Sequence, residues 1–324
     1  MRLSRRGLLG LGLALPAGFA AADTVWPTAL VMGTGRPGGY YTTYGPEWGR
    51  LAEASAGVEI AFRASGGAAA NILLIEQGEA QLGMTTVTVA AEAMTGEGAW
   101  TAGVKFQEFR ALFPMFPSVL QIVAPQPSGI VSLAELAGQV VGIGPDGGTG
   151  ATAVPDIFAS VGVLPARVLT GDYEQQVRDM FAGRIAACAF IAAPPVPAIV
   201  SAAMGRKLSL IGFSQAEVEQ VARTSPGMTR MVLQAGLFPG QSVAVASVGT
   251  ANFAIGAASL QDTVAEAVTM AALRNQADFA ALVPAAAQTP ETAPILQGGV
   301  MFHPGAVVAL RRFGMDVPKK FVEA

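Results

Sequence analysis

The sequence predicts an α/β protein built around parallel strands. Strand-like and helix-like segments alternate, and a strand followed by a glycine-rich turn and a helix occurs twice, near residues 28–41 and 140–161. The chain is 52% hydrophobic and 13% charged, which suits large buried sheets. Its 324 residues are enough for two domains, each with its own core. Alternating βα units form parallel sheets that bind ligands at the carboxyl ends of their strands.

The N-terminal segment is typical of an export signal peptide. Arg2, Arg5 and Arg6 precede an apolar run at residues 8–15, and small residues follow as far as Ala22. This pattern predicts a signal peptide over residues 1–22 that is cleaved near Ala22, and its apolar run is too short to span a bilayer. The adjacent arginines favour the twin-arginine route, with Sec export as the alternative. We therefore expect a periplasmic protein.

The charge balance indicates which partners to expect. The formal net charge is −3, and cleavage would remove three arginines but no acid, so the mature chain is mildly acidic. Nucleic-acid binding needs a clustered basic face, which argues against such a partner. After the signal segment, no run approaches the ~20 unbroken apolar residues of a membrane helix. We expect a chain that does not itself cross the membrane.

The individual elements follow from apolar periodicity and from glycine and proline positions. In the first half, we expect strands at residues 28–32, 58–62, 81–84 and 119–124, and helices from about residue 40, at 68–78 and at 132–137. In the second half, we expect strands at 140–144, 185–191 and 243–254, helices at 152–161, 173–182, 198–204, 260–279 and within 302–317, and a turn-rich stretch at 225–241. The proline-bounded crossings near 113–124 and 241–250 are expected to be hinges between domains.

The first glycine-rich turn, residues 33–39, supports two hypotheses. Glycines let the backbone approach a ligand, and the free amides at a helix N-terminus favour an anion. Gly33, Gly35 and Gly38 also satisfy the dinucleotide-binding pattern, so an exported nicotinamide-dependent oxidoreductase is the alternative. That alternative needs an acid about 20 residues later at a strand end. The expected strand instead ends in Arg63, which could meet a 2′-phosphate, and Glu53 has the spacing without the context.

Groups for catalysis are scarce. His303 is the only histidine, and Cys188 is the only cysteine, within an apolar strand-like run where a buried thiol is expected rather than a nucleophile. His303, Pro304 and Gly305 form a typical helix start. Neither a metal-ligand motif nor a phosphate loop occurs. We therefore predict a protein that is not an enzyme, with no cofactor, metal site or catalytic residue.

A series of short motifs resembles the TAXI family of solute receptors of tripartite ATP-independent periplasmic (TRAP) transporters. The resemblance covers the mature chain, and its motifs are Gly33-Thr34-Gly35 to Tyr40-Tyr41, Ala64-Ser65-Gly66-Gly67 with Asn71, residues 78–83, residues 133–138, residues 192–199, residues 237–241 and His303-Pro304-Gly305-Ala306. The chain departs from the family pattern at three places. Arg36 and Ala193 stand where the family usually has glycine, and Thr86 and Thr88 stand where Gln and Asp are common. The second glycine turn, residues 148–150, aligns ambiguously with the family's usual Ser-Gly-Thr.

The resemblance implies a periplasmic binding protein type II-like fold. Two α/β domains would be joined by hinge strands and would close on a ligand in the cleft between them, like a Venus flytrap. Domain I would comprise residues 23–116 and 246–324, and domain II residues 117–245. The family captures a small organic acid or amino acid and delivers it to a membrane permease. Amino acids, dicarboxylates and keto acids all stay open as ligands.

Taken with this resemblance, small hydroxyls, amides and aromatic rings near the glycine turns form the expected ligand site. Its members are Thr34, Arg36, Tyr40, Tyr41, Ser65, Gly67, Asn71, Thr85, Thr86, Thr149, Phe190 and Pro194. For Arg36 the hypothesis is a bidentate pair with a ligand carboxylate, against the default of an arginine on the surface, and Arg63, Arg178 and Arg230 are the alternative candidates. Two further functions stay open: a binding protein that signals to a sensor kinase, and a peptide-binding module.

Overall fold

A computed structural model describes residues 29–287 and 291–322, so the expected signal peptide at 1–22 lies outside the described residues. All described strands belong to one sheet system. They are β1 (Ala29–Gly33), β2 (Glu59–Arg63), β3 (Leu82–Thr86), β4 (Phe109–Pro125), β5 (Val140–Gly142), β6 (Arg167–Leu169), β7 (Ala187–Ala192), β8 (Leu208–Ile211), β9 (Thr229–Leu233) and β10 (Val245–Ala257).

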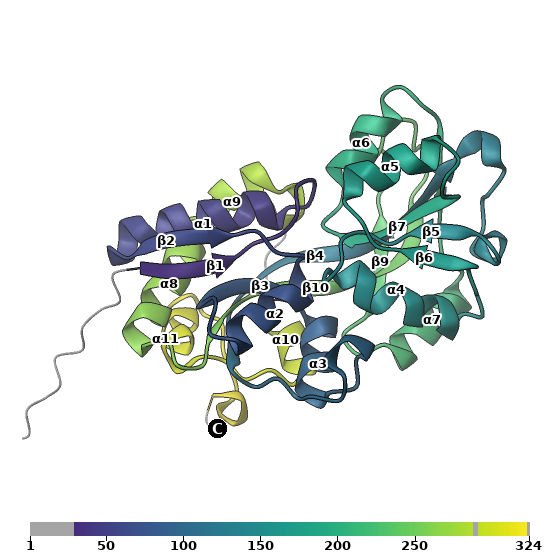
Figure 1. Ribbon diagram of the computed structural model, residues 1–324. Coiled ribbons are helices and arrows are strands. Elements are labelled where there is room, and N and C mark those ends of the chain that lie inside the picture. Colours follow the sequence, from purple (N-terminus) through teal and green to yellow (C-terminus); the bar gives the residue numbers. More distant parts are fainter. Residues whose placement is uncertain (1–28, 288–290, 323–324) are drawn as a thin grey trace, which may run out of the picture.

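Helices cover both faces of the sheet system (Figure 1). They are α1 (Tyr41–Ala56), α2 (Ala68–Glu76), α3 (Val87–Thr95), α4 (Thr149–Ser160), α5 (Tyr173–Phe181), α6 (Pro197–Ala203), α7 (Gln215–Thr224), α8 (Asp262–Arg274), α9 (Gln276–Leu282), α10 (Ala293–Gln297) and α11 (Pro304–Arg312). The sequence sets their ends locally. At α7, for example, Ser214 and Glu217 form a capping box.

The strand order is β2-β1-β3-β10-β4-β7-β5-β6, with β8 on β4 and β9 on β10. Strands β1, β2 and β3 pair in parallel, as do β5, β6 and β7, whereas β4 and β10 run antiparallel to their neighbours. Figure 1 shows two lobes, with β4 and β10 running between them. The fold is thus α/β, as predicted, and its sheet is curled and mixes parallel with antiparallel strands.

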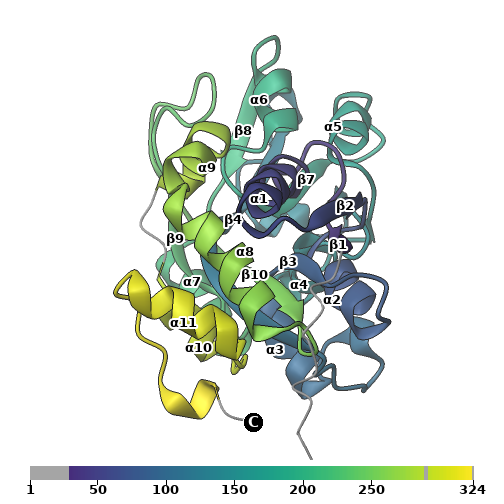
Figure 2. The ribbon, with the colours of Figure 1, turned by 90° about the vertical axis from the view of Figure 1, so that its left-hand side faces the viewer.

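Separate hydrophobic cores define the two lobes. The core of lobe I is drawn from residues 30–116 and 253–317, with Ala193 added. Two clusters from residues 120–248 form the core of lobe II. In lobe I, α8 packs between α1 and α11 (Figure 2), and the indole Nε1 of Trp48 donates a hydrogen bond to the Val268 carbonyl at 3.0 Å. Each lobe therefore has a core of its own.

Strands β4 and β10 are the crossings between the lobes. They pair antiparallel from Phe109↔Ala257 to Val119↔Gly249, with register shifts near Ala251 and Ala254. Pro114 and Pro117 lie within β4. Proline removes a ladder hydrogen bond, and shifts in register weaken pairing locally. Two strands thus run between the lobes where the crossings were predicted, and they are longer than the sequence indicated; their role as hinges stays a prediction.

Several expected elements differ from the structure. The helix expected at 260–279 is divided at Asn275, whose side-chain Nδ2 donates to the Ala271 carbonyl at 2.7 Å and competes with helix continuation. The helix expected at 132–137 is a single 3-10 turn, Ala134–Leu136. The turn-rich stretch at 225–241 contains β9, because pairing with β10 stabilises a segment with weak local preference.

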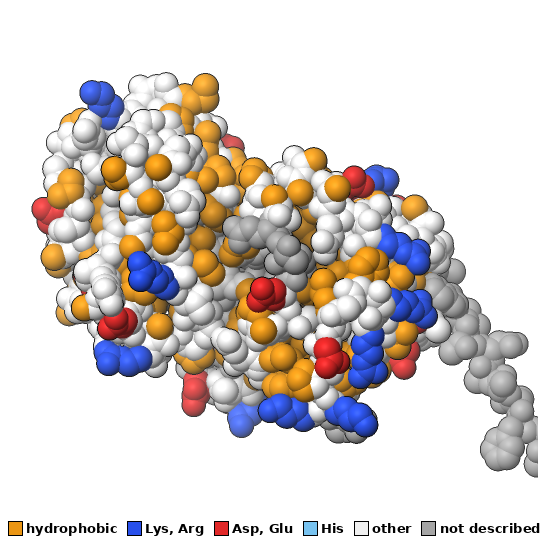
Figure 3. All heavy atoms as spheres, turned by 180° about the vertical axis from the view of Figure 1, so that it is seen from behind, with side chains coloured by type: hydrophobic (Ala, Val, Ile, Leu, Met, Phe, Trp, Pro, Cys, Tyr) orange, Lys and Arg blue, Asp and Glu red, His pale blue; other side chains and the backbone are white. Residues whose placement is uncertain are grey.

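The described surface carries scattered charges. On the face shown in Figure 3, Lys and Arg side chains are interspersed with Asp and Glu over both lobes, and hydrophobic side chains show between them. Within residues 29–287 and 291–322, none of the helices combines the length and apolar character that crossing a bilayer requires.

Candidate ligand-binding site

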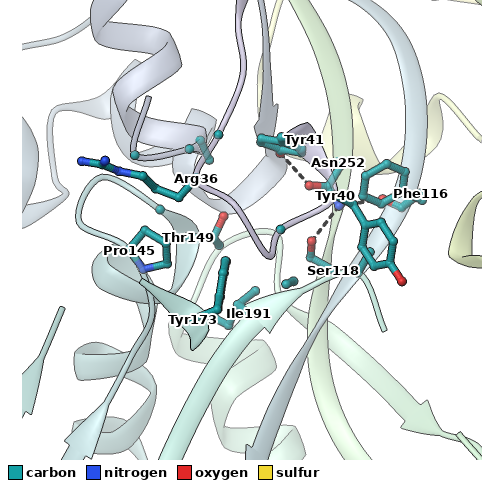
Figure 4. Close-up of a pocket in the computed structure, with 18 residues that line it drawn as sticks. Arg36, Tyr40, Tyr41, Phe116, Ser118, Pro145, Thr149, Tyr173, Ile191 and Asn252 are labelled. Atoms are coloured by element: carbon teal, nitrogen blue, oxygen red, sulfur yellow. Dashed lines mark hydrogen bonds between the residues drawn. The ribbon is translucent and has the colours of Figure 1, made fainter. Parts of the chain in front are cut away.

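A cavity lies between the two lobes, beside the crossing strands (Figure 4). About 460 Å³ of space there is not filled by protein atoms, and part of it is open to solvent. Lobe I, lobe II and both crossing strands contribute to its wall. The lining residues are Gly35, Arg36, Gly39, Tyr40, Tyr41, Gly66, Gly67, Ala68, Phe116, Ser118, Pro145, Gly148, Thr149, Tyr173, Ile191, Ala192, Ala193 and Asn252.

Three helices begin at this cavity. Helices α1, α2 and α4 follow the carboxyl ends of the parallel strands β1, β2 and β5, and each contributes first-turn residues to the lining: Tyr41, Ala68 and Thr149. Gly67, just before α2, has φ +125°, a conformation that side chains rarely adopt. The helix dipoles place partial positive charge at these starts, although the Ala69 and Ala70 amides of α2 donate to the Gly147 carbonyl and the Thr42 and Thr43 amides of α1 donate to the Gly39 and Tyr40 carbonyls. The cavity therefore favours an anion.

The lobes touch through backbone atoms at the rim of the cavity. The Gly147 carbonyl of lobe II accepts hydrogen bonds from the amides of Ala69, at 2.9 Å, and Ala70, at 3.2 Å. A Cβ atom at position 66 would overlap the Asp146 carbonyl oxygen, so only glycine allows this approach. On another side, the Tyr40 hydroxyl donates to the Pro195 carbonyl at 3.1 Å. The structure is therefore a closed arrangement of the two lobes.

The end of the cavity against the crossing strands is aromatic. Tyr40, Tyr41 and Phe116 lie together there in Figure 4, and Tyr41 packs against Phe116 with ring centroids 6.4 Å apart. The buried Asn252 holds this end in place. Its Oδ1 accepts from the Tyr41 hydroxyl at 2.6 Å, and its Nδ2 donates to the Phe116 carbonyl at 2.7 Å and to the Ser118 hydroxyl at 2.8 Å.

The cavity brings together some of the residues expected to bind a ligand. Those that line it are Arg36, Tyr40, Tyr41, Gly67 and Thr149. In Figure 4 the Arg36 side chain extends past Pro145, at the end away from Phe116. Arg36 is exposed, whereas the alternatives Arg63 and Arg178 do not line the cavity and pair with Glu79 and Glu174.

Other expected site residues lie behind the lining and hold it. Asn71 is fully buried: its Nδ2 donates to the carbonyls of Thr34 and Met84, both at 2.9 Å, and its Oδ1 accepts from the Ser65 hydroxyl at 2.7 Å. The Thr34 hydroxyl donates to the Arg63 carbonyl at 3.1 Å. These side chains fix the glycine turn after β1 to its neighbours, because buried polar groups need partners.

The four remaining expected residues likewise do not line the cavity. The Thr85 hydroxyl donates to the Ala68 carbonyl at 3.2 Å, and the Thr86 hydroxyl shares a 3.2 Å hydrogen bond with that of Thr149 across the lobes. Phe190 is fully buried beneath Tyr173, with ring centroids 4.9 Å apart. Pro194 is half-buried in the loop after β7.

Several lining residues from the crossing strands and from lobe II are not predicted by the sequence. They are Phe116, Ser118, Tyr173, Ile191 and Asn252. A lone amide within the apolar run at 243–254 was the available signal for Asn252, because a buried polar side chain in a strand needs a partner. Ile191 carries no local signal, since pairing of β4 with β7 brings it to the cavity, and Tyr173 is the first residue of α5.

The structure gives no support to the dinucleotide hypothesis. Its sheet order around the glycine turn is β2-β1-β3-β10, whereas a dinucleotide-binding fold has the order 3-2-1-4. Glu53 accepts a hydrogen bond from the Ile60 amide at 2.7 Å, and Arg63 forms an ion pair with Glu79 at 2.6 Å. Neither Glu53 nor Arg63 lines the cavity beside the glycine turn.

The residues considered for catalysis have structural roles. His303 caps α11 by accepting from the Gly305 amide, as the sequence predicted, and its Nε2 lies 2.8 Å from the Leu260 carbonyl. Cys188 is fully buried in β7, where burial raises the pKa of its thiol and keeps it protonated. Among the described residues, no three His, Cys, Asp or Glu side chains form a group able to hold a metal.

Two further hollows are partly open to solvent. One, of about 1010 Å³, lies between α5 and α6, and the other, of about 1000 Å³, lies between α3, α4, α7 and α10. The latter contains Glu92 and Glu97 from lobe I and Asp156 from lobe II. Trp100 Nε1 donates to the Glu92 carboxylate at 2.6 Å. Burial, together with the nearby Asp156, raises the pKa of Glu92 from 4.5 to about 7 despite this hydrogen bond.

The raised pKa of Glu92 predicts a pH-dependent stability. Folding favours the protonated carboxyl, so its contribution is fully present below pH 4.5 and is lost as the pH rises through about 7. At pH 8 we expect Glu92→Gln to raise the melting temperature by several degrees, because it raises the free energy of unfolding by at most about 3 kcal/mol. At pH 5 we expect little change in the melting temperature. Thermal melts from pH 4.5 to 8.5 measure this. Glu97→Gln, at an exposed position in the same cavity, is the control. Parallel curves for wild type and Glu92→Gln would contradict the prediction.

Comparisons with known proteins agree with this architecture. Residues 32–314 match the NMT1-like family. A solved protein from Bordetella bronchiseptica RB50 superposes with a TM-score of 0.53 at 15% identity, covering 90% of each chain. A protein described as a periplasmic transporter gives 0.50 at 15% identity, covering 77% of this chain and 83% of its own. The alkanesulfonate-binding protein SsuA from Xanthomonas axonopodis pv. citri, bound to MOPS, gives 0.50 at 13% identity, covering 89% and 92%. At these identities the likeness concerns the fold, which is of the periplasmic binding protein type II-like class.

Proposed function

We propose, since the chain belongs to the NMT1-like family, that it is a periplasmic solute-binding receptor for a small carboxylate-bearing ligand. The observation that carries the proposal is the start of three helices at one cavity between two lobes. Amides at helix starts can hold a carboxylate without a catalytic group. SsuA, a protein of similar fold, is described as binding alkanesulfonates, which are also organic anions.

Capture by closure of the lobes is part of this proposal. The contacts of Gly147 with α2 and of Tyr40 with Pro195 form only when the lobes meet, and β4 and β10 run between the two cores, where a hinge would act. We assign domain I to residues 23–116 and 246–324, and domain II to residues 117–245. The buried side chains fall into separate cores close to these bounds, with Val248 in a lobe II cluster and Ala193 in the lobe I core, which supports the division.

The proposal also covers the transporter that this receptor would serve. We infer that the protein is a TAXI receptor that delivers its ligand to a TRAP membrane permease, after export by the twin-arginine route and cleavage near Ala22. The motif series from Gly33 to His303 supports this assignment. A gene for a large multi-span permease beside this gene is the expected finding. A neighbouring sensor kinase instead would favour a signalling receptor.

A thermal-shift screen of the processed protein tests the proposed function. At a concentration 100 times its dissociation constant, a ligand stabilises the folded state by about 2.7 kcal/mol, or a few degrees for a chain of this size. We expect a shift with organic carboxylates and none with nicotinamide nucleotides. Stabilisation by nucleotides alone would overturn the receptor assignment.

Arg36→Ala is expected to weaken carboxylate binding about fivefold, because an exposed cation contributes about 1 kcal/mol or less. Calorimetry at low and high salt measures the change, and the loss should shrink as salt screens the charge. Arg167→Ala is the control, since Arg167 is exposed on lobe II and does not line the cavity. Equal affinities for wild type and Arg36→Ala would remove Arg36 from the site.

A further inference from the structure

The charges around the inter-lobe cavity are of one sign. Among the described lining residues, Arg36 carries the single formal charge, and none is Asp or Glu. The acids nearest in sequence, Asp146, Asp172 and Glu174, have exposed side chains, and Glu174 lies 3.6 Å from Arg178 in an ion pair. The cavity therefore offers no carboxylate to a positively charged group on a ligand.

The phenols of the lining do not replace a carboxylate. Burial raises the pKa of Tyr173 to about 12 and also raises that of Tyr41, so both hydroxyls stay neutral at physiological pH. The Tyr41 hydroxyl already donates to Asn252. Among the described residues, the Tyr173 hydroxyl has no hydrogen-bond partner although its ring lines the cavity. A free hydroxyl donor suits an oxygen atom of the ligand.

The two ends of the cavity differ in chemistry. Figure 4 shows Arg36, Pro145 and Thr149 toward one end and Tyr40 and Phe116 toward the other. The first end contains the starts of α2 and α4. These two helix starts lie against each other, since a Cβ atom at Gly67 would be 3.3 Å from the Gly148 Cα. This end suits one anionic group. The second end suits an apolar body, since aromatic rings there cover carbon atoms.

This division disfavours two of the ligand classes that the proposed function leaves open. The ammonium of an α-amino acid would lose its hydration in the closed cavity without gaining an anionic partner. The second carboxylate of a dicarboxylate would meet the aromatic end, where the described lining has no cation. A monocarboxylate without an amino group avoids both the unpaired ammonium and the unpaired second carboxylate.

We propose that the ligand is a monocarboxylate with an apolar body and no amino group, of the class of branched-chain or aromatic 2-oxo acids. The assignment rests on the proposed receptor function and adds the substrate class to it. The carboxylate binds at the starts of α2 and α4 beside Arg36, the 2-oxo oxygen accepts from a hydroxyl of the lining, and the side chain packs against Tyr40, Phe116 and Ile191.

Calorimetry with matched acids tests this class, because each pair differs mainly at the 2-position. The pairs are 4-methyl-2-oxopentanoate with leucine and phenylpyruvate with phenylalanine, and 2-oxoglutarate reports on a second carboxylate. We expect at least one of the two oxo monoacids to bind at least 100-fold more tightly than its amino acid and at least tenfold more tightly than 2-oxoglutarate. Tyr173→Phe is expected to weaken its binding about fivefold.

The outcomes separate this inference from the proposed function. Binding of leucine, phenylalanine or 2-oxoglutarate as tightly as the better oxo monoacid overturns the substrate class and leaves a carboxylate receptor. Absence of binding by every carboxylate, with a folded protein by circular dichroism, overturns both. Strong binding of an oxo monoacid that Gly66→Ala abolishes supports both, because that substitution acts on closure rather than on the ligand's chemistry.

Discussion

Gly66→Ala is expected to reduce ligand affinity more than 100-fold while leaving each lobe folded. The new methyl group would overlap the Asp146 carbonyl oxygen, which belongs to the backbone of the opposite lobe and cannot rotate away. The lobes would be held apart and the ligand would keep the contacts of one lobe only. Affinity falls in proportion to the fraction of molecules able to reach the binding-competent state. Calorimetry measures the affinity, and small-angle scattering measures the separation of the lobes.

Gly205→Ala provides a matched control for this effect. It adds the same methyl group at a glycine without positive φ, where no atom lies within 4 Å. We expect wild-type affinity and an unchanged radius of gyration. Tight binding by Gly66→Ala, with a scattering curve identical to that of wild type, would show that the close backbone approach at Gly66 is not needed for capture.

Asn71→Ala is expected to cost about 3 kcal/mol of folding stability. The substitution leaves the buried carbonyls of Thr34 and Met84 without a donor and the Ser65 hydroxyl without an acceptor. An unsatisfied buried polar group typically costs about 1–3 kcal/mol, and the lost side-chain volume adds to this. Chemical denaturation followed by circular dichroism measures the loss. Ligand affinity should also fall, because the same hydrogen bonds hold the glycine turn that lines the cavity.

Asn275→Ala separates a general effect of losing an asparagine from the network at Asn71. Asn275 is half-buried and makes one local hydrogen bond, to the Ala271 carbonyl at the end of α8. We expect a loss below about 1 kcal/mol, in the range of a single local hydrogen bond. If both variants lost similar stability, the glycine turn would not depend on Asn71.

Local patterns in the sequence predicted most of the elements around the cavity. The apolar runs before glycine-rich turns correspond to β1 and β5, and the helix start at His303 is α11. Patterns that depend on distant partners were harder to interpret. Residues 229–233 form a strand because β10 pairs with them, and Asn275 divides an alanine-rich segment that has high helix propensity throughout.

The candidate site was predictable where it follows a glycine turn and unpredictable where it depends on pairing between distant segments. Arg36, Tyr41 and Thr149 lie at turn or helix starts, and they line the cavity. Phe116 and Asn252 reach it because β4 and β10 pair beside it, with Asn252 held by the Phe116 carbonyl. Asn71, next to a glycine motif, supports the turn from behind because its helix packs against the sheet rather than along the cavity wall.

The split core of lobe I has a consequence for biosynthesis. Residues 120–248 contain all the buried side chains of the lobe II clusters, so lobe II is able to fold as soon as this stretch is synthesised. Lobe I must wait for β10, which pairs along β3 from Leu82↔Gly256 to Thr86↔Asn252. Contacts between such distant residues form slowly. A nascent chain that stops before residue 245 leaves the apolar edge of β3 unpaired, and unpaired edges promote aggregation. Premature termination therefore yields an aggregation-prone fragment rather than a smaller receptor.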